Sequence, residues 1–229
     1  FCLRVAAKAK TADPDLKTIH YVAPTVWAWR PERAAKMARH IDHVLALFPF
    51  EPPLMQAEGM TCDFVGHPVV AENVPSKAAQ TRFRSELGIG ANEDMLLILP
   101  GSRKGEISRM APVFGEVVAK IAKARPQTRF VLPTVPNVAD QLAEIITDWP
   151  GNPILLDPRQ LETGLAESRK SLAFAAADLA LAASGTVSLE LAAMDTPMVI
   201  AYKFNWLTTR IVKKKVNLKS ATLVNILTD

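Results

Sequence analysis

Short apolar runs alternate with longer stretches of helical period along most of the 229 residues. Runs of Val, Ile and Leu predict buried strands, whereas apolar residues at i, i+3, i+4 and i+7 predict helices packed against them. Strands buried on both faces and joined through helices form parallel sheets with helices on either side. The alternation therefore predicts an α/β fold built from doubly wound parallel sheets. The expected strands are 18–22, 43–48, 63–65, 95–99, 128–132, 153–156, 178–181 and 198–201, and the expected helices are 31–40, 51–58, 76–87, one ending near 124, 138–147, 167–176, 186–194 and 205–214.

The helix that ends near Ala124 contains Pro112. Proline is tolerated in the first turn of a helix but disrupts the interior, because it lacks an N–H group and clashes with the preceding turn. We therefore expect this helix to begin no earlier than about Ser108.

A boundary between two domains is predicted near residue 72. Gly66-His67-Pro68 interrupts the apolar pattern, a polar segment follows, and a new alternation of helices and strands begins after it. The expected domains are residues 1–71 and 72–229. Two doubly wound domains facing each other would form a cleft, and open α/β sheets bind ligands at the carboxyl ends of their strands.

Composition excludes several classes of protein. Hydrophobic residues make up 49% of the chain, yet no apolar run reaches the roughly 18 residues that a membrane span needs. The two cysteines, Cys2 and Cys62, lack metal-ligand spacing, which favours a reducing, cytoplasmic compartment. We expect a soluble or peripheral protein. Because the chain starts at Phe1 inside a helical pattern and ends after an apolar segment, we also expect a fragment lacking both termini.

The first candidate site is the Gly-rich turn Pro100-Gly101-Ser102-Arg103-Lys104-Gly105-Glu106, which follows a buried strand. Glycine lets the backbone approach an anion, and Arg103 offers donors suited to a phosphate. The turn is not a Walker loop, since Glu106 stands where that motif has Lys. An ordinary strand–helix turn is the alternative.

The second candidate site is Ser184-Gly185-Thr186, which also follows an apolar strand. Ser184 is a good N-cap residue, and the amides at a helix start favour a phosphate. Glu190 lies about one and a half turns into the helix, at a distance that suits a ribose attached to that phosphate. A solvated Glu190 on an amphipathic helix is the alternative.

Two further segments combine aromatic and basic residues. The loop 21–31 contains Trp27, Trp29 and Arg30, which suits an acyl or sugar site with Arg30 on a phosphate, although Trp27 is equally suited to core packing. The segment 205–219 carries Trp206 and a basic run, 213–215. It suits an anionic membrane surface or a solvated helix face, and it lacks any nucleic-acid motif.

Five strings, in this order and at similar spacing, resemble those of bacterial lipid-A-disaccharide synthases. They are YVAPTVWAWRP (21–31), DHVLALFPFE (42–51), FVGHP (64–68), LPGSRKGEI (99–107) and ASGTVSLE (183–190), and the resemblance covers nearly the whole chain.

The resemblance implies a GT-B fold, in which two Rossmann-like domains face a cleft and the C-terminal one holds the sugar nucleotide, here with an incomplete N-terminal domain. It implies an inverting glycosyl transfer that joins UDP-2,3-diacylglucosamine and 2,3-diacylglucosamine 1-phosphate to give lipid A disaccharide 1-phosphate and UDP. It implies no metal and no other cofactor. The resemblance also suggests a protein on the inner face of the inner membrane and a possible homodimer.

Carried over residue by residue, the resemblance assigns the acceptor side to Trp29, Arg30 and His67. Asn225 matches an Asn important in the family, although Val224 replaces the family's Pro. The family's proposed general base would lie immediately before Phe1, so we expect this fragment alone to be inactive. The residues assigned to UDP are Gly101, Ser102, Arg103, Glu106, Ser184, Gly185, Thr186 and Glu190.

Without the resemblance, the residues leave two other functions open. A sugar-phosphate isomerase would also use a Ser-Gly-Thr turn at a helix start, but it leaves the loop with Trp27 and Trp29 unexplained. A nucleotide-binding module without catalytic activity needs no site for an acylated sugar.

Overall fold

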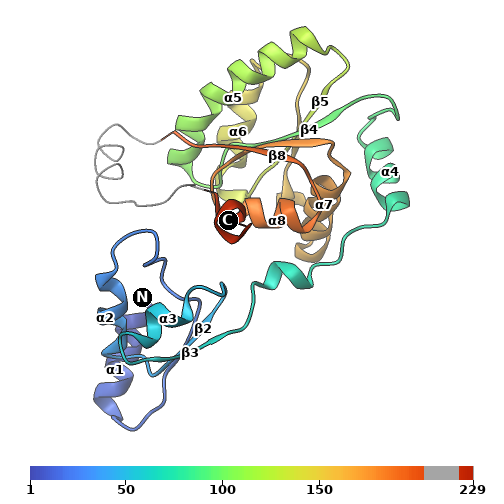
Figure 1. Cartoon of the computed structure of the whole chain (residues 1–229). Helices are drawn as coiled ribbons and strands as arrows, with labels where there is room; N and C mark the ends of the chain where they lie inside the picture. The colour runs from blue at the N-terminus through green and yellow to red at the C-terminus, as the bar shows by residue number, and fades with distance from the viewer. Residues whose placement is uncertain (204–221, 229) are drawn as a thin grey trace. The chain divides into compact units, whose positions relative to one another are not determined.

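The computed structural model describes residues 1–203 and 222–228. The described residues form two compact units, Phe1–Val70 and 71–203 with 222–228, each with its own sheet (Figure 1). The sequence placed the boundary at residue 72. The helix expected at 205–214 lies outside the described residues.

The first unit contains a parallel sheet of three strands in the order β1-β2-β3. In this sheet Val44 lies between His20 and Cys62, and the core of the unit contains Val44, Ala46 and the helix residues Met37 and Met55. The elements are α1 (Cys2–Ala12), β1 (Ile19–Tyr21), α2 (Glu32–Ala38), β2 (His43–Ala46), α3 (Pro52–Gln56), β3 (Thr61–Phe64) and the 3₁₀ turn η1 (Pro68–Ala71).

The second unit contains a parallel sheet of five strands in the order β6-β5-β4-β7-β8. Its elements are α4 (Lys77–Glu86), β4 (Met95–Leu99), α5 (Lys104–Ala124), β5 (Arg129–Pro133), η2 (Pro136–Val138), α6 (Ala139–Ile146), β6 (Ile154–Leu156), η3 (Pro158–Gln160), α7 (Thr163–Ala176), β7 (Leu179–Ala183), α8 (Val187–Ala193), β8 (Met198–Ala201) and α10 (Leu223–Thr228).

The central strand β4 is buried along its whole length because both faces of the sheet are covered. Met95, Leu97 and Leu99 point into a core shared with α4, α7 and α8. Leu96 and Ile98 point into the opposite core, which α5 and α6 complete. Side chains alternate between the faces of a strand, so an uninterrupted apolar run is what a strand in the middle layer requires.

The expected start of α5 is wrong. The helix begins at Lys104 and contains Pro112 in its interior. A proline there costs roughly 3 kcal/mol in an isolated helix. Pro112 lies on the exposed side, where the carbonyl group that loses its partner, that of Ser108, can be hydrated. The opposite side of α5 buries Ile107, Phe114 and Val118 completely, and this packing offsets the loss. Helix α7 likewise begins earlier than expected, at Thr163 rather than at residue 167.

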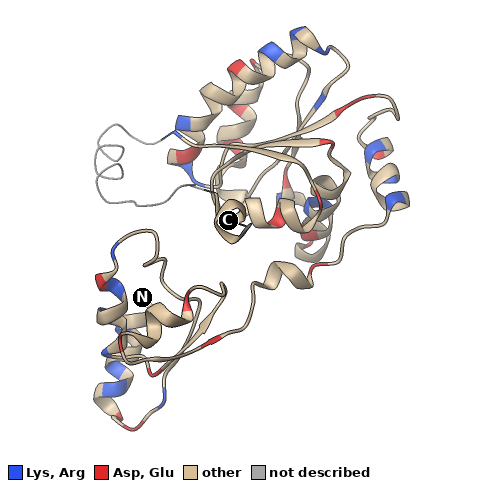
Figure 2. Ribbon diagram, viewed as in Figure 1, with Lys and Arg blue, Asp and Glu red and all other residues tan. Residues whose placement is uncertain are grey.

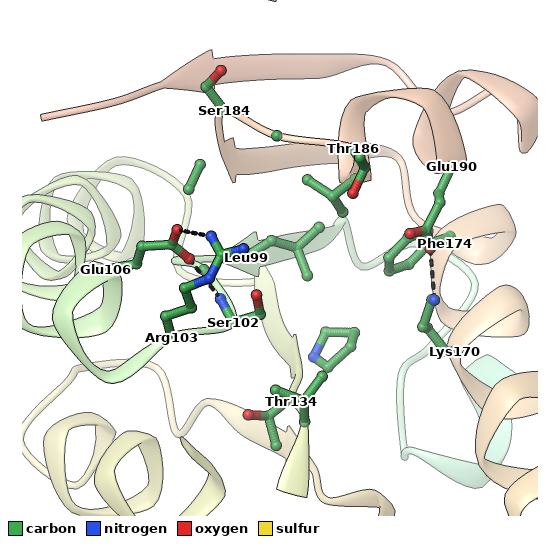
Figure 3. A pocket seen from close by; sticks show the side chains of 16 residues that line it. Leu99, Ser102, Arg103, Glu106, Thr134, Lys170, Phe174, Ser184, Thr186 and Glu190 are labelled. Atoms are coloured by element: carbon green, nitrogen blue, oxygen red, sulfur yellow. Dashed lines mark hydrogen bonds and ion pairs between the residues drawn. The ribbon is translucent and has the colours of Figure 1, made fainter. Parts of the chain in front are cut away.

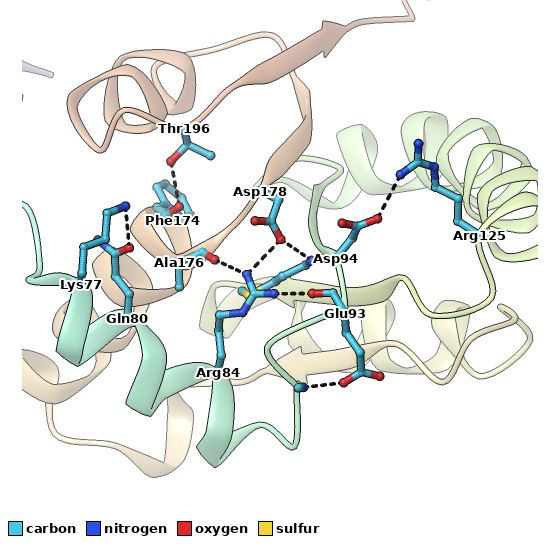
Figure 4. Close-up of polar contacts among 12 residues, drawn as sticks. Lys77, Gln80, Arg84, Glu93, Asp94, Arg125, Phe174, Ala176, Asp178 and Thr196 are labelled. Carbon is cyan, nitrogen blue, oxygen red and sulfur yellow. Dashed lines mark hydrogen bonds and ion pairs between the residues drawn. The ribbon is translucent and has the colours of Figure 1, made fainter.

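Arg84 fastens α4 to the amino ends of the central strands (Figure 4). Its Nη1 donates to the carbonyl oxygen of Ala176 at 3.0 Å and to Oδ2 of Asp178 at 2.9 Å, and its Nη2 donates to the carbonyl oxygen of Glu93. Oδ2 of Asp178 also accepts the N–H of Met95, the first residue of β4, at 2.7 Å. One guanidinium thus joins three segments that are distant in the sequence.

We expect Arg84→Met to lower the free energy of unfolding by about 1.5–3 kcal/mol, because hydrogen bonds to charged groups contribute about that much and this side chain is only 16% exposed. Urea denaturation followed by circular dichroism measures the change. Arg82→Met, which removes an exposed arginine from the same helix, is the matched control. Equal stability of the two variants would show that the Arg84 contacts contribute nothing.

Candidate functional site

Two loops that the sequence singled out meet at the carboxyl edge of the five-stranded sheet. The chain runs outward from β4 to β5 and β6, then returns to the other side of β4 to form β7 and β8. Ligands of open α/β sheets bind where the strand order reverses in this way. The loop after β4 and the loop after β7 leave the sheet at this point, on neighbouring strands (Figure 3).

A cavity of about 380 Å³ lies between these loops. Pockets that bind small molecules usually measure about 300–1,000 Å³. The structure brings together all eight residues assigned to UDP from the sequence. Gly101, Ser102, Arg103, Glu106, Ser184, Gly185, Thr186 and Glu190 line this one cavity.

The first loop requires a glycine at position 101. Its φ is +125°, a conformation that residues with a side chain rarely adopt. A Cβ atom built there would also lie 2.7 Å from the Cβ of Glu106. Glu106 therefore folds back over the loop because Gly101 leaves the space for it.

Glu106 fixes the conformation of this loop. Its Oε2 accepts the N–H of Ser102 at 3.1 Å, and its Oε1 pairs with Nη1 of Arg103 at 2.7 Å. The amide of Ser102 is thus directed at the carboxylate of Glu106, whereas the sequence suggested that this turn would face the phosphate of a ligand. Arg103 is 80% exposed, whereas Glu106 is 15% exposed. Because water solvates the guanidinium, we compare the pair with surface ion pairs, which contribute only about 0.2–1 kcal/mol. The guanidinium of Arg103 can therefore exchange Glu106 for another anion at little cost.

The second loop differs from expectation at Ser184. Helix α8 begins at Val187 with Thr186 at the N-cap position and without a side-chain cap, so Ser184 does not cap the helix. Instead, the N–H of Ser184 donates to the carbonyl oxygen of Ala201 and ties the loop to β8. The hydroxyl of Ser188 donates to the carbonyl oxygen of Gly185 at 2.9 Å, which holds the turn from inside the helix.

Glu190 forms an ion pair on the side of the cavity formed by α7 and α8. Its Oε2 lies 2.6 Å from Nζ of Lys170, which comes from α7 (Figure 3). Burial alone would lower the pKa of Lys170, but the hydrogen bond and charge of Glu190, with those of Glu167, outweigh burial and raise it. Lys170 is therefore a cation at neutral pH, and the interpretation of Glu190 as a solvated residue is wrong.

Sequence reasoning missed the five cavity residues that lie outside the two motifs: Pro133, Thr134, Val135, Lys170 and Phe174. Pro133 and Thr134 come at the carboxyl end of β5 and immediately after it, so the rule that ligands bind at strand ends could have found them. Lys170 and Phe174 lie one turn apart on α7, with Nζ of Lys170 5.8 Å from the Phe174 ring centre. No local motif marks them.

The residues expected on the acceptor side lie in the first unit and form two separate groups. The guanidinium of Arg30 lies 4.2 Å from the centre of the Trp29 ring, and Arg30 has a φ of +56°. His67 stacks on Phe48 at 6.0 Å, and its Nδ1 accepts the N–H of Val69. The neutral ring therefore carries its proton on Nε2, where it can donate to an oxygen.

Trp27 packs into an aromatic cluster of the first unit. This agrees with the alternative interpretation from the sequence, in which Trp27 serves core packing. Its ring lies 5.3 Å from that of Phe50, and its Nε1 donates to Oε1 of Glu51. Oε2 of the buried Glu51 accepts the N–H groups of Leu47 and Phe48, both at 3.0 Å. Burial raises the pKa of Glu51, against these donors, which lower it.

Other candidates lie apart from the cavity. Asn225 is exposed on α10, which packs against α8, and it does not line the cavity. The basic segment around Trp206 and residues 213–215 lies outside the described residues. Within residues 1–203 and 222–228, His, Cys, Asp and Glu side chains do not gather in a group of three or more that could hold a metal ion.

Solved structures with the same fold include two UDP-GlcNAc 2-epimerases. The enzyme from Neisseria meningitidis, solved with UDP-GlcNAc bound, matches 99% of this chain and 63% of its own, with a TM-score of 0.63 and 15% identity. The enzyme from Methanocaldococcus jannaschii matches 91% of this chain and 60% of its own, with a TM-score of 0.57 and 14% identity. These matches confirm the expected α/β fold of GT-B type, while the cleft between two domains stays a prediction.

Relatives by sequence are far more similar. The lipid-A-disaccharide synthase of Ruegeria pomeroyi is 58% identical over all 229 residues, and that of Rhodospirillum centenum is 44% identical over the same length. The chain spans 57% and 55% of these two proteins. The family model described as lipid-A-disaccharide synthetase matches residues 1–229. With both domains' motifs in register and this match over its full length, the chain belongs to the lipid-A-disaccharide synthetase family.

Proposed function

We propose that the chain is part of a glycosyltransferase that makes lipid A disaccharide 1-phosphate from UDP-2,3-diacylglucosamine and 2,3-diacylglucosamine 1-phosphate, releasing UDP. Membership of the family supports this proposal. The observation that carries it is the cavity at the carboxyl ends of β4 and β7, lined by both of the loops that suit a phosphate.

In the proposed reaction the 6-hydroxyl oxygen of the acceptor attacks the anomeric carbon of the donor sugar. The bond from that carbon to the diphosphate breaks, its electron pair stays on UDP, and the hydroxyl proton passes to a base. Negative charge therefore develops on the diphosphate. Donors preorganised around such charge are the largest contribution to many enzymatic rate enhancements. We assign this role to Arg103 and to the loops at Gly101–Ser102 and Ser184–Thr186.

The remaining residues assigned to UDP suggest how the nucleotide is oriented in the cavity. We propose that Glu190 accepts hydrogen bonds from the ribose hydroxyls. A second cavity of about 260 Å³ shares Pro133, Thr134 and Lys170 with the first and continues toward Leu156. We propose that the uracil ring attached to a ribose beside Glu190 extends into this second cavity. Glu106 acts by holding the loop of Arg103 in place.

We assign the acceptor to the first unit. Trp29 and Arg30 present an aromatic face with a guanidinium over it, which suits a sugar phosphate. His67 offers an N–H to an acceptor oxygen. We also propose Asn225 as a catalytic residue, because it matches an Asn that is important in the family.

Attachment to a membrane belongs to the same proposal, because both substrates carry acyl chains. The described residues contain no helix that is long and apolar enough to cross a bilayer. On the described helices, acidic and basic residues are interspersed (Figure 2), whereas the segment 210–219 carries five basic residues. We propose that this segment binds anionic lipid on the cytoplasmic face of the inner membrane, and that the protein forms a homodimer.

Calorimetric titration of the intact protein with UDP, ADP and glucosamine 6-phosphate separates the proposed function from its rivals. The proposal requires saturable binding of UDP in preference to the other two. Preference for glucosamine 6-phosphate would favour an isomerase, and binding of UDP without formation of disaccharide from the two acylated sugars would favour a module without catalytic activity.

We expect Arg103→Ala to weaken the binding of UDP by about 1.5–3 kcal/mol, roughly ten- to a hundredfold, because hydrogen bonds to charged groups contribute about this much. Breaking the exposed pair with Glu106 subtracts little from this effect. Calorimetry with UDP measures the change.

Lys104→Ala is the control for the Arg103 variant. It removes the same charge from the adjacent residue, whose side chain does not line the cavity. Equal affinities of the wild type and Arg103→Ala would remove Arg103 from the site. Equal losses in the two variants would indicate a long-range effect of charge.

We expect changing Lys213, Lys214 and Lys215 together to Gln to release the protein from vesicles that contain anionic lipid. Each basic residue near such a surface contributes about 1 kcal/mol, so three together shift binding strongly at low salt. Co-sedimentation with vesicles measures the bound fraction, with neutral vesicles as the control. Undiminished binding by the triple variant would show that another surface is the anchor.

A further inference from the structure

Lys170 occupies a position that the proposed reaction does not yet use. Its Nζ lies 2.6 Å from Oε2 of Glu190, 3.5 Å from Oε2 of Glu167 and 5.8 Å from the centre of the Phe174 ring. Figure 3 shows Lys170 and Glu190 facing each other beside Phe174. Lys170 lines both the main cavity and the smaller one beside it.

The pair is sheltered on one side. The side chains of Lys170 and Glu190 are 36% and 24% exposed, and Oε2 of Glu190 is fully buried against the ammonium. The part of the chain that the structure describes provides no hydrogen-bond donor for the other oxygen, Oε1. The ammonium therefore binds one oxygen of the carboxylate and leaves the other for a ligand.

Such an arrangement fixes a side chain before a ligand arrives. A glutamate has three rotatable side-chain bonds, and ordering a side chain of this kind on binding costs affinity, roughly two- to tenfold. The ion pair with Lys170 at Oε2 already restricts these rotations. A carboxylate held in this way is a strong acceptor for a hydroxyl group.

We propose that Lys170 is a positioning residue that holds Glu190 for recognition of the ligand's ribose and so selects ribonucleoside diphosphates over their 2′-deoxy forms. This inference rests on the proposed function, because it assumes that Glu190 meets the ribose. Lys170 acts through Glu190 and makes no contact with the sugar that is transferred. The chemical feature selected is a pair of adjacent hydroxyl groups, which a carboxylate can accept together.

The test compares UDP with 2′-deoxyuridine diphosphate in the intact protein. The wild type should prefer UDP, and Lys170→Met should reduce this preference by roughly three- to tenfold by weakening UDP more than the deoxy ligand. Lys170→Arg, which retains the charge, should keep most of the preference. Lys120→Met, which changes an exposed lysine of α5 that lines neither cavity, is the control for removing a positive charge.

A double variant adds a readout that a purely structural role of Lys170 would not change. Glu190→Gln alone should abolish most of the preference, and Lys170→Met added to it should reduce the preference little further, since residues that act as a unit are not additive. If Lys170→Met does not fold, as judged by circular dichroism, Lys170→Gln replaces it with the same expected result, because Gln is uncharged.

Each other outcome contradicts a specific step. Equal weakening of both ligands in Lys170→Met would show that Lys170 attracts the diphosphate by its charge and does not position Glu190. An unchanged preference would exclude Lys170 from ribose recognition, as would a wild type that binds both ligands equally. Absence of UDP binding by the wild type would instead contradict the proposed function itself.

Discussion

Burial of β4 on both faces is the constraint on which the candidate site depends. This strand pairs with β5 on one side and with β7 on the other, and its side chains alternate between two complete cores. A shift of one residue would exchange the two sets of side chains, so the register is fixed. The residues that follow Leu99 and Ala183 must therefore emerge on neighbouring strands. The cavity is a consequence of this pairing, and the loops only decide its chemistry.

The sequence predicted the positions that this constraint controls. The bounds of β4 and β8 agree with the expected runs at 95–99 and 198–201, because a continuous apolar run identifies a buried strand without reference to the rest of the fold. The loops after β4 and β7 were predicted from the strand ends in the same way. In contrast, the start of α5 depends on how strongly the buried side of the helix packs, which the rule applied to Pro112 does not include.

Contacts between helices were beyond reach of the sequence. Lys170 meets Glu190 only because α7 and α8 cover the same face of the sheet, and nothing within α7 distinguishes Lys170 from a solvated lysine. The expected cap at Ser184 was wrong for a related reason, since β8 binds the amide of Ser184 and the helix starts later. Local preference for a cap is weak, about 1 kcal/mol, and pairing in the sheet overrides it.

The two ion pairs of the cavity differ in a way that separates their roles. Arg103 and Glu106 neutralise each other, as do Lys170 and Glu190, so the four groups give the cavity little net charge to attract a diphosphate. The cavity can therefore attract a diphosphate only if one of the two cations separates from its carboxylate partner. Arg103 lies three residues before Glu106 at a helix start and is itself 80% exposed, so its guanidinium exchanges partners easily. Lys170 is the more sheltered cation, at 36% exposed, and separating it from Glu190 would leave Oε2 of Glu190 buried without a cation. Arg103 is therefore the group that can turn to a phosphate, while Lys170 stays with Glu190 and keeps that carboxylate in place.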